Sequence, residues 1–404
     1  MPDTGGKVPY IFVVAGEPSG DALGGALIGA LRERTGGRLR VAGIGGEQMA
    51  AQGVQSLVPL SDLAVAGVAE VLPRAPLILR RVRETVAAIQ VDLPDAVVTI
   101  DSSGFSWRIA QRLRGRGETL PLIHYVAPMV WAWRPGRARR MARWYDHLLA
   151  LLPFEPPYFE AVGLKATYVG HPVLESGADR GDADRFRGQY GLTRDELLIA
   201  VLPGSRGGEV RRLMPIFGET LRLLQQRVGP FRVVMPTVAH VADAVAAGAR
   251  GWPGNAIIVR GNEAKYDAFA ASRAALAASG TVALELALAG LPMAVAYRLN
   301  PLTEALLNHV VKVRQVNLIN LLLDRALVPE HLRDRCAPGP LAASLAALIE
   351  DEDVRSAHCR GYDTAMRRLR GAGTSPSRAA ADRILAIIAA RSDTNSALRE
   401  THDE

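Results

Sequence analysis

Short apolar runs alternate with longer mixed segments along almost the whole chain of 404 residues. The runs are rich in Val, Ile, Leu and Ala. Continuous apolar runs of this length are typical of strands that are buried on both faces of a parallel sheet. The predicted strands are Tyr10–Ala15, Ala96–Ile100, Leu120–Val126, His147–Leu152, Ala166–Val169, Leu198–Leu202, Phe231–Met235, Ala256–Val259, Ala274–Ala278 and Met293–Ala296.

The segments between these strands are predicted as helices, so the fold class is α/β with parallel sheets. The first helix runs from about Asp21 to Arg34 and the second from about Phe105 to Arg114. The others are Glu209–Arg227, Glu263–Ser272, Thr281–Ala289, Leu302–Val311, Gly339–Glu350 and Ser375–Ala390.

The length of the chain exceeds one ordinary hydrophobic core and predicts two domains. The polar stretch Glu175–Gly191 contains no predicted strand, and the alternation of strands and helices starts again after it. We interpret this stretch as the linker region. We expect a first domain over residues 1–174, a second over 175–374, a helix at 375–391 that crosses back to the first domain, and a frayed tail at 392–404.

Basic residues outnumber acidic ones, with 48 Lys and Arg against 41 Asp and Glu, for a net charge of +7. Arginine is far commoner than lysine, and its planar guanidinium suits phosphate groups. This balance fits a phosphorylated substrate, an anionic lipid or a nucleic acid as partner. The arginine excess fits a GC-rich genome equally well.

Several classes of protein are excluded by the composition. Two cysteines, Cys336 and Cys359, are too few for a disulfide scaffold, and neither lies in a CxxC pair that could bind zinc. No HExxH or EF-hand pattern occurs, so we expect neither a metal nor another cofactor. The segment Met1–Pro9 lacks the features of a signal peptide, and no apolar run reaches the ~20 residues that span a bilayer. A cytoplasmic location is therefore expected.

The turn after the first predicted strand is rich in glycine and hydroxyl groups. Glycine lets a ligand approach the backbone, and the following helix offers free N–H groups and a positive dipole end. Capping of that helix by Ser19 or Asp21 explains the same residues equally well. The candidate substrate-binding residues here are Gly16, Glu17, Ser19, Gly20 and Asp21.

A second turn, Leu202–Glu209, places three glycines, a hydroxyl and an arginine at the start of a helix. A diphosphate would find backbone donors and a guanidinium within one turn. An arginine beside a helix N-terminus is unfavourable unless an anion is present, which favours binding over a plain surface turn. The candidates are Gly204, Ser205 and Arg206.

A third turn, Ser279-Gly280-Thr281, is followed by Glu285. Thr281 and Glu285 are four residues apart and share one helix face. A carboxylate there can accept hydrogen bonds from both hydroxyls of a ribose. An exposed surface acid is the plainer interpretation, but the preceding turn favours ligand binding.

Asp101 follows a predicted strand at the carboxyl edge where α/β sheets bind ligands. Glycosyl transfer by direct displacement needs a base for the acceptor hydroxyl and positive charge for the leaving diphosphate. Asp101 can be that base and Arg206 the positive charge, one from each half of the chain. Capping of the next helix is the alternative for Asp101. His124 and His171, at or near strand ends, are candidates for a base or a ligand donor.

Two segments suggest a membrane surface. Trp131–Tyr145 contains five arginines, no acid and three of the five tryptophans. This composition fits a nucleic-acid groove or a lipid headgroup region. Leu63–Val86 is apolar with a basic flank, and an ordinary core helix is its plainer interpretation. Trp133 is a candidate substrate contact, and the candidate membrane-facing residues are Leu72, Leu77, Ile78, Arg80, Arg81, Arg137 and Arg140.

These motifs together resemble the lipid-A-disaccharide synthases, which are inverting glycosyltransferases of GT-B architecture. The matching segments, in the same order from about residue 10 to about residue 325, are AGEPSGD ending at Asp21, HYVAPMVWAWR at His124–Arg134, LPFE at Leu152–Glu155, GHP at Gly170–Pro172, LPGSRG at Leu202–Gly207, SGTVALE at Ser279–Glu285 and VNLINL at Val316–Leu321.

The resemblance implies two Rossmann-like domains that face a central cleft. It implies transfer of a sugar from UDP-2,3-diacylglucosamine to 2,3-diacylglucosamine 1-phosphate, giving a β-1,6-linked disaccharide and UDP. It also implies a peripheral position on the anionic inner face of the inner membrane, without nucleic acid as a partner, and leaves both a monomer and a homodimer open.

The resemblance also carries residue roles. Asp101 matches the family's acid–base aspartate and Arg206 its essential arginine. Ser279, Thr281, Glu285 and Asn320 match positions near UDP. The family often has a second acid where this chain has Gly104, which puts any role of that second acid in doubt.

Two other functions remain open. Another GT-B enzyme that uses UDP-N-acetylglucosamine, a transferase or a 2-epimerase, would share the turns but would need no lipid-facing surface. A non-enzymatic basic module that binds RNA or lipid through Trp131–Tyr145 would leave the LPGSRG and SGTVALE turns unexplained.

Overall fold

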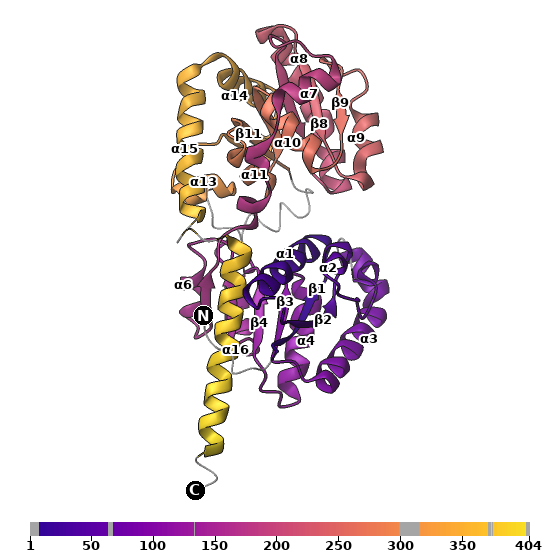
Figure 1. Cartoon of the computed structure of the whole chain (residues 1–404). Helices are drawn as coiled ribbons and strands as arrows, with labels where there is room; N and C mark the ends of the chain where they lie inside the picture. Colours follow the sequence, from indigo (N-terminus) through magenta and orange to yellow (C-terminus); the bar gives the residue numbers. More distant parts are fainter. Residues whose placement is uncertain are drawn as a thin grey trace. The chain divides into compact units, whose positions relative to one another are not determined.

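The computed structural model describes residues 8–63, 68–132, 134–298, 315–370, 373 and 375–400. Their contacts divide the chain into two compact units (Figure 1). The first unit comprises Met1–Pro172 and Arg370–Glu404, and the second comprises Val173–Leu369. Each unit contains one six-stranded sheet, and the described strands pair in parallel, so the predicted α/β class is confirmed.

The sheet of the first unit has the strand order β2-β1-β3-β4-β5-β6. Its strands are β1 (Tyr10–Ala15), β2 (Arg40–Ile44), β3 (Ala96–Ile100), β4 (Leu122–Tyr125), β5 (His147–Ala150) and β6 (Lys165–Tyr168). The sequence prediction missed β2. This strand lies at the edge of the sheet and contains Arg40 and Gly43, so it lacks the apolar run of a strand that is buried on both faces.

Helices cover both faces of this sheet (Figure 1). Ile11 and Val13 of β1 pack with α1 (Pro18–Arg34) and α16 (Pro376–Glu400), whereas Phe12 and Val14 pack on the opposite side with α3 (Val68–Asp92) and α4 (Ser103–Gly115). The shorter helices are α2 (Glu47–Ala51), η1 (Leu60–Asp62), α5 (Gly136–Met141) and α6 (Pro156–Glu160).

Two helices differ from their predicted bounds by three residues or more. Helix α1 begins at Pro18 rather than near Asp21, because proline fits the first helical position, where its missing N–H has no partner to lose. Helix α16 continues to Glu400, beyond its predicted end at Ala390 and through most of the segment that was expected to be frayed. Its inner face packs on α1, and two ion pairs, Arg34–Asp382 and Arg378–Glu33, flank that contact.

The sheet of the second unit has the order β12-β11-β10-β7-β8-β9. Its strands are β7 (Leu198–Leu202), β8 (Arg232–Pro236), β9 (Ile257–Val259), β10 (Ala274–Ala278), β11 (Met293–Tyr297) and β12 (Glu330–Leu332). The short edge strand β12 was not predicted. Ile199 and Val201 of β7 pack against α8 (Gly207–Val228) and α14 (Pro338–Glu350) in one core.

Among the remaining helices of this unit, those in the segment interpreted as a linker and helix α15 (Glu352–Arg370) were not predicted. The segment interpreted as a linker contains η2 (Pro172–Glu175), η3 (Ala178–Arg180) and α7 (Ala183–Tyr190), and Asp182 caps α7 by accepting from the Arg185 backbone N–H at 2.9 Å. The others are η4 (Ala239–Val241), α9 (Ala242–Gly248), α10 (Asn262–Ala271), α11 (Val282–Leu288), α13 (Leu318–Leu323) and η5 (Arg333–Arg335). The predicted helix Leu302–Val311 lies outside the described residues.

Both sheets have a strand at which the winding reverses. In the first, β1 lies between β2 and β3, and in the second, β7 lies between β8 and β10. In open α/β sheets ligands bind outside the carboxyl ends of the strands at such a point. The turns after β1 and β3 in one unit, and after β7 and β10 in the other, are therefore the places to look for a site.

Candidate active site

Asp101 is the first residue after β3 and has an unusual backbone. Both Asp101 and Ser102 have left-handed φ angles, 47° and 46°, which residues with a side chain rarely adopt in succession. The Asp101 N–H donates to the Tyr125 carbonyl at 2.9 Å, and its own carbonyl accepts from the Ser106 hydroxyl at 2.8 Å. These bonds hold the strained turn in place, as is common at functional sites.

Burial raises the pKa of the Asp101 carboxyl above its usual value, while a hydrogen bond from the Ser102 backbone lowers it in part. A carboxylate with a raised pKa is a stronger base. Gly104, which follows the first residue of α4, is exposed, and a side chain there would lie near the Arg108 guanidinium. The Gly104 carbonyl accepts a hydrogen bond from that guanidinium.

The glycine turn after β1 lies directly against the Asp101 turn. A Cβ atom on Gly16 would overlap the Ser102 side chain, and one on Gly20 would lie 3.5 Å from the Ile100 carbonyl oxygen. Glycine at position 16 is therefore required for the two turns to meet. Glu17 and Ser19 of the same turn are exposed.

Asp21, by contrast, points into the unit and is 4% exposed. Its carboxylate accepts hydrogen bonds from the backbone N–H groups of Gly46, Gln48 and Met49 at 2.7, 2.9 and 3.0 Å. These groups belong to the start of α2, so Asp21 caps α2 rather than its own helix. The structure thus gives Asp21 an internal partner that the sequence did not indicate.

In the second unit, the LPGSRG turn connects β7 to α8. Gly204 has φ 109°, and a Cβ atom there would overlap Glu209. Ser205 and Arg206 are exposed, and the Ser205 carbonyl is 2.8 Å from His240 Nε2. The Arg206 Nη1 atom lies 3.2 Å from the Glu209 carboxylate.

This ion pair corrects one step of the sequence argument. We expected Arg206 at a helix N-terminus to require a bound anion, but Glu209, three residues later, supplies a negative charge. The guanidinium side chain is 78% exposed, so the pair is weak and the arginine can exchange it for a ligand.

The SGTVALE turn follows β10, the neighbour of β7 in the sheet. Thr281 precedes α11 and is exposed together with Gly280, while Ser279 is half-buried. Glu285 accepts hydrogen bonds from Lys265 Nζ at 2.9 and 3.0 Å and from the Tyr266 hydroxyl at 3.2 Å. These bonds orient the carboxylate, and its oxygens retain capacity to accept hydrogen bonds from a ligand.

Asn320 has an internal structural contact. It is 1% exposed, its amide group donates to the Val328 carbonyl and the Glu330 carboxylate at 2.8 and 2.6 Å, and its oxygen accepts from the Leu327 and Val328 N–H groups. These four bonds use the amide fully. Asn320 thus holds the loop before β12.

His124 is likewise internal. It is 1% exposed on β4, its Nδ1 atom is 2.8 Å from the Thr99 hydroxyl, and its ring packs on Tyr145 with centroids 4.9 Å apart. Burial lowers its pKa to about 3, so the ring is neutral. Burial lowers the pKa of His171 to about 4 for the same reason. Trp133 lies outside the described residues.

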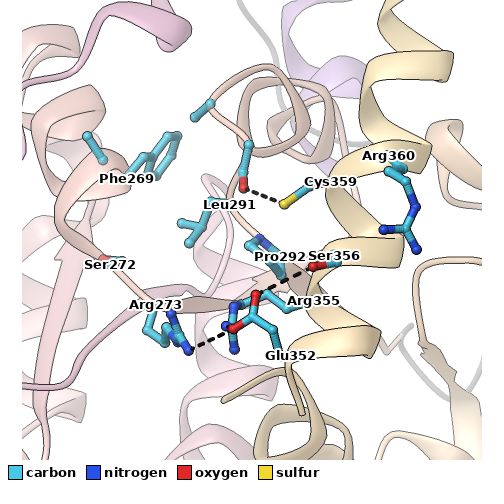
Figure 2. A pocket seen from close by; sticks show the side chains of 13 residues that line it. Phe269, Ser272, Arg273, Leu291, Pro292, Glu352, Arg355, Ser356, Cys359 and Arg360 are labelled. Atoms are coloured by element: carbon cyan, nitrogen blue, oxygen red, sulfur yellow. Dashed lines mark hydrogen bonds and ion pairs between the residues drawn. The ribbon is translucent and has the colours of Figure 1, made fainter. Parts of the chain in front are cut away.

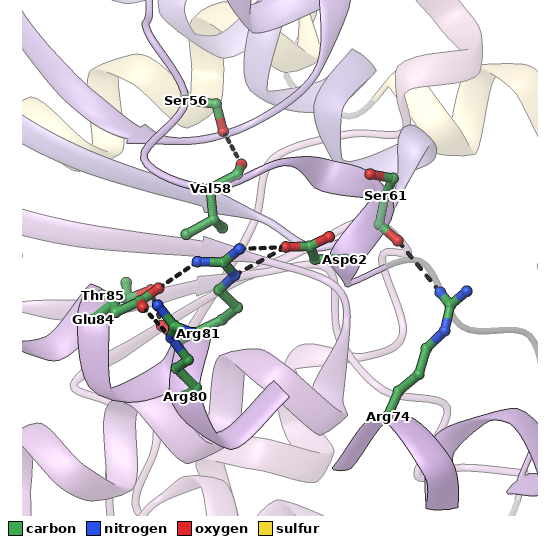
Figure 3. Close-up of polar contacts among 9 residues, drawn as sticks. All are labelled: Ser56, Val58, Ser61, Asp62, Arg74, Arg80, Arg81, Glu84 and Thr85. Atoms are coloured by element: carbon green, nitrogen blue, oxygen red, sulfur yellow. Dashed lines mark hydrogen bonds and ion pairs between the residues drawn. The ribbon is translucent and has the colours of Figure 1, made fainter. Parts of the chain in front are cut away.

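The candidate membrane-facing residues separate into two groups. The Arg81 side chain does not face outward toward a membrane. Its guanidinium lies between Asp62 and Glu84 and forms an ion pair of 2.7 Å with each carboxylate (Figure 3). Ile78 packs against the core, and Arg137 lies over the Trp107 ring at 5.6 Å. Arg80 and Arg140 are exposed and Leu77 is half-buried, while the side chain of Leu72 lies outside the described residues.

Sequence reasoning missed two functional candidates, Lys265 and Glu155. Lys265 lies on α10. Its contact with Glu285 could not be predicted from the sequence, because the two residues are 20 positions apart in the chain. Glu155 belongs to the LPFE motif, which entered only as part of the resemblance. It is 3% exposed, and burial raises its pKa to about 7.

A cavity of about 420 Å³ lies elsewhere in the second unit (Figure 2). Arg273, Arg355, Arg360 and Glu352 line it, with Leu291 and Pro292. Its walls include the residues just before β10 and β11, so it opens at the amino ends of these strands. None of the predicted site residues lines this cavity, and it lies at the edge of the sheet where α/β folds rarely bind substrate.

No group of three or more His, Cys, Asp or Glu side chains is arranged to hold a metal ion within the described parts of the chain. Among the helices as far as they are described, none is long and apolar enough to cross a bilayer.

Comparison with known proteins places these turns in a family context. The family model described as lipid-A-disaccharide synthetase matches residues 11–382. The lipid-A-disaccharide synthase of Rhodospirillum centenum is 54% identical, over 95% of this chain and 96% of the relative. The enzyme of the same name from Paramagnetospirillum magneticum is 50% identical, over 94% and 97% of the two chains.

Solved structures share the fold at low identity. A putative UDP-N-acetylglucosamine 2-epimerase from Listeria monocytogenes superposes with a TM-score of 0.64 at 12% identity, covering 96% of this chain and 98% of that one. MurG from Acinetobacter baumannii superposes with a TM-score of 0.54 at 15% identity, covering 93% and 99%. These structures are similar to this chain in architecture.

Proposed function

The chain belongs to the lipid-A-disaccharide synthase family, and we propose that it joins UDP-2,3-diacylglucosamine to 2,3-diacylglucosamine 1-phosphate. Its general role is that of a glycosyltransferase in lipid A biosynthesis. The products of the proposed reaction are a β-1,6-linked disaccharide 1-phosphate and UDP. The observation that carries the proposal is the half-buried carboxyl of Asp101, which stands on a strained left-handed turn at the carboxyl edge of its sheet.

Asp101 acts as the base in this proposal. Its carboxylate takes the proton of the acceptor's 6-hydroxyl as that oxygen attacks the anomeric carbon of the donor sugar. The bond between this carbon and the diphosphate oxygen breaks, and UDP leaves with the electron pair. A single displacement of this kind inverts the anomeric centre, which accounts for the β-linkage.

UDP binding is assigned to the second unit. The exposed Ser205 and Arg206, with the N-terminus of α8, can bind the diphosphate, because helix N–H groups and a guanidinium both favour negative charge. Glu285, oriented by Lys265, can accept the hydroxyl hydrogens of the ribose. In this arrangement Arg206 leaves Glu209 and stabilises the charge that develops on the departing diphosphate.

The alternative within the same fold is a UDP-N-acetylglucosamine 2-epimerase, because several of the solved structures with this architecture carry that name. The family membership at 54% identity favours the synthase. A 2-epimerase would convert the sugar nucleotide without an acceptor.

One incubation separates these functions. Purified protein is mixed with UDP-2,3-diacylglucosamine and 2,3-diacylglucosamine 1-phosphate, and the products are analysed by mass spectrometry. We expect the disaccharide 1-phosphate and UDP in equal amounts. A protein that changes UDP-N-acetylglucosamine without an acceptor, and forms no disaccharide, would contradict the proposal.

We also propose that the first unit binds the anionic inner face of the inner membrane, where both acylated substrates reside. Arg83, Arg139 and Arg140 are exposed, on α3 and α5. Basic residues near an anionic surface each contribute about 1 kcal/mol to binding. Arg81, which pairs with Asp62 and Glu84, contributes to the fold instead.

Reversing two of these charges is expected to weaken membrane binding. In low salt, the double variant Arg83→Glu and Arg140→Glu should bind vesicles that contain anionic lipid at least about thirtyfold less well, because roughly 2 kcal/mol of attraction is removed. Vesicle co-sedimentation measures this. The matched control is Arg222→Glu, an exposed arginine of the second unit. Equal binding by the double variant and the control would reject the proposed surface.

A further inference from the structure

The peptide group that joins Ser205 to Arg206, in the LPGSRG turn, has hydrogen-bond partners on both of its sides. The Ser205 carbonyl oxygen lies 2.8 Å from His240 Nε2. The Arg206 N–H, at the other end of the same peptide group, donates to the Glu209 carboxylate at 3.4 Å. The peptide is trans, so its carbonyl and its N–H point in opposite directions. His240 and Glu209 therefore lie on opposite sides of this peptide group.

His240 reaches the turn from the neighbouring strand. Strand β8 pairs in parallel with β7, so the turns that follow the two strands lie side by side. His240 belongs to η4, and the next residue, Val241, is 4% exposed and packs in the core of the second unit. The Val241 N–H also donates to the Val238 carbonyl at 3.2 Å. The backbone at His240 is thus anchored, although the residue itself is exposed.

The contact with His240 restrains a turn that is rich in glycine. Glycine stands on both sides of the peptide group, at Gly204 and Gly207, so the backbone has few restraints of its own. A carbonyl oxygen can only accept a hydrogen bond, so His240 Nε2 is the donor. If the peptide group turned over, the carbonyl oxygen would lie where the Arg206 N–H now points. Its partial negative charge would then repel an anion.

Two donors of Arg206 meet one anionic group in this structure. The Glu209 carboxylate accepts from the Arg206 backbone N–H and, at 3.2 Å, from Arg206 Nη1. The same carboxylate lies against the backbone of the turn, because its Oε2 atom would be 2.5 Å from a Cβ atom on Gly204. A phosphate group also offers anionic oxygens to an N–H and a guanidinium. The carboxylate therefore marks a position in the turn that a phosphate can take.

We propose that His240 is a positioning residue for the diphosphate of the sugar-nucleotide donor. Its ring holds the Ser205 carbonyl on one side of the turn and thereby presents the Arg206 N–H to a phosphate oxygen on the other side. The phosphate replaces the Glu209 carboxylate at this N–H, and His240 itself does not touch the diphosphate. This inference rests on the proposed function, in which the turn binds UDP.

Two amides of different length test this role. The side-chain nitrogen of glutamine can take the place of His240 Nε2, whereas that of asparagine is too short to reach Ser205. His240→Ala and His240→Asn should bind UDP about threefold to tenfold more weakly, as expected for the loss of one hydrogen bond. His240→Gln should remain within about twofold of the natural protein. Ligand-observed NMR titration measures these affinities.

Uridine is the matched control ligand, because it lacks the diphosphate. Its affinity should be the same in the natural protein and in all three variants at His240. The control variant is Gln226→Ala, which changes an exposed, uncharged residue near the other end of α8 and should bind UDP like the natural protein.

A second measurement follows the Arg206 N–H directly and needs no sugar nucleotide. Inorganic pyrophosphate should shift the Arg206 amide proton resonance in the natural protein and in His240→Gln, because a phosphate oxygen replaces the Glu209 carboxylate as acceptor. At the same degree of saturation, the shift should be clearly smaller in His240→Ala. An Arg206 resonance that does not respond to pyrophosphate in the natural protein would overturn the inference.

The UDP titrations can overturn it as well. Equal UDP affinity in His240→Ala and the natural protein would remove the role of His240. UDP binding by His240→Gln as weak as that of His240→Ala would show that the ring does not act through the Ser205 carbonyl. An equal loss of uridine affinity would indicate a general disturbance of the unit. Weaker UDP binding by His240→Ala, together with no disaccharide product from the natural protein, would instead reject the proposed function and leave the role of His240 standing.

Discussion

Replacing Asp101 by asparagine is expected to lower kcat for disaccharide formation by about 10²–10⁴-fold, the usual contribution of a general base. The amide has nearly the shape of the carboxyl, so the left-handed turn at Asp101 and Ser102 should persist. Asparagine cannot accept the proton of the acceptor hydroxyl. Because the turns assigned to UDP belong to the other unit, UDP affinity should change by less than about twofold.

Steady-state kinetics and calorimetric UDP titration measure the two quantities. The pH profile adds a further check. Since burial raises the pKa of Asp101, the natural protein should lose kcat/KM as the pH falls through this raised pKa, where the base becomes protonated. Glu47→Gln, an exposed acid of the same unit, serves as control. Full activity of the Asp101→Asn variant would remove Asp101 as the base.

Replacing Arg206 by alanine should have the second largest effect. Loss of a charged group that stabilises a leaving group costs about 10²–10³-fold in kcat. UDP should also bind more weakly, because the guanidinium contacts the diphosphate in the bound state as well. Product formation and UDP titration again measure both effects.

The ion pair with Glu209 allows a sharper control. If Arg206 must leave Glu209 to reach the diphosphate, Glu209→Gln should bind UDP as tightly as the natural protein or more tightly. Arg222→Ala removes another exposed arginine that pairs with a glutamate three residues away, and it should behave like the natural protein. Unchanged kinetics and UDP affinity in Arg206→Ala would count against its role.

The central strands could be predicted from the sequence because they are buried on both faces. The structure has β1, β3, β7 and β10 with the predicted bounds. The edge strands β2 and β12 were missed, since an edge strand needs fewer apolar residues. Helix α15 was missed because most of its surface is charged, although its buried residues, among them His358, Tyr362 and Leu369, recur at helical spacing.

The residues of the candidate site could be predicted from the sequence only in part. The turn motifs predicted Asp101, Arg206 and Glu285 at the carboxyl ends of strands, and the structure places all three there or one turn beyond. The hydrogen-bond and ion-pair partners of these polar side chains could not be predicted from the sequence. Asp21 caps α2, which lies 25 or more residues further along the chain, and Glu285 pairs with Lys265.

The sequence by itself determined the α/β class, the turns that follow the central strands and the family to which they belong, because these depend on residues that are close together in the chain. Only the tertiary structure decided that Asp21, His124 and Asn320 are internal, that Arg206 already has an anion beside it, and that Glu155 is buried without a cation. The physical reason is that burial and electrostatic partners come from residues far apart in the chain, and these two factors set the charge of each group.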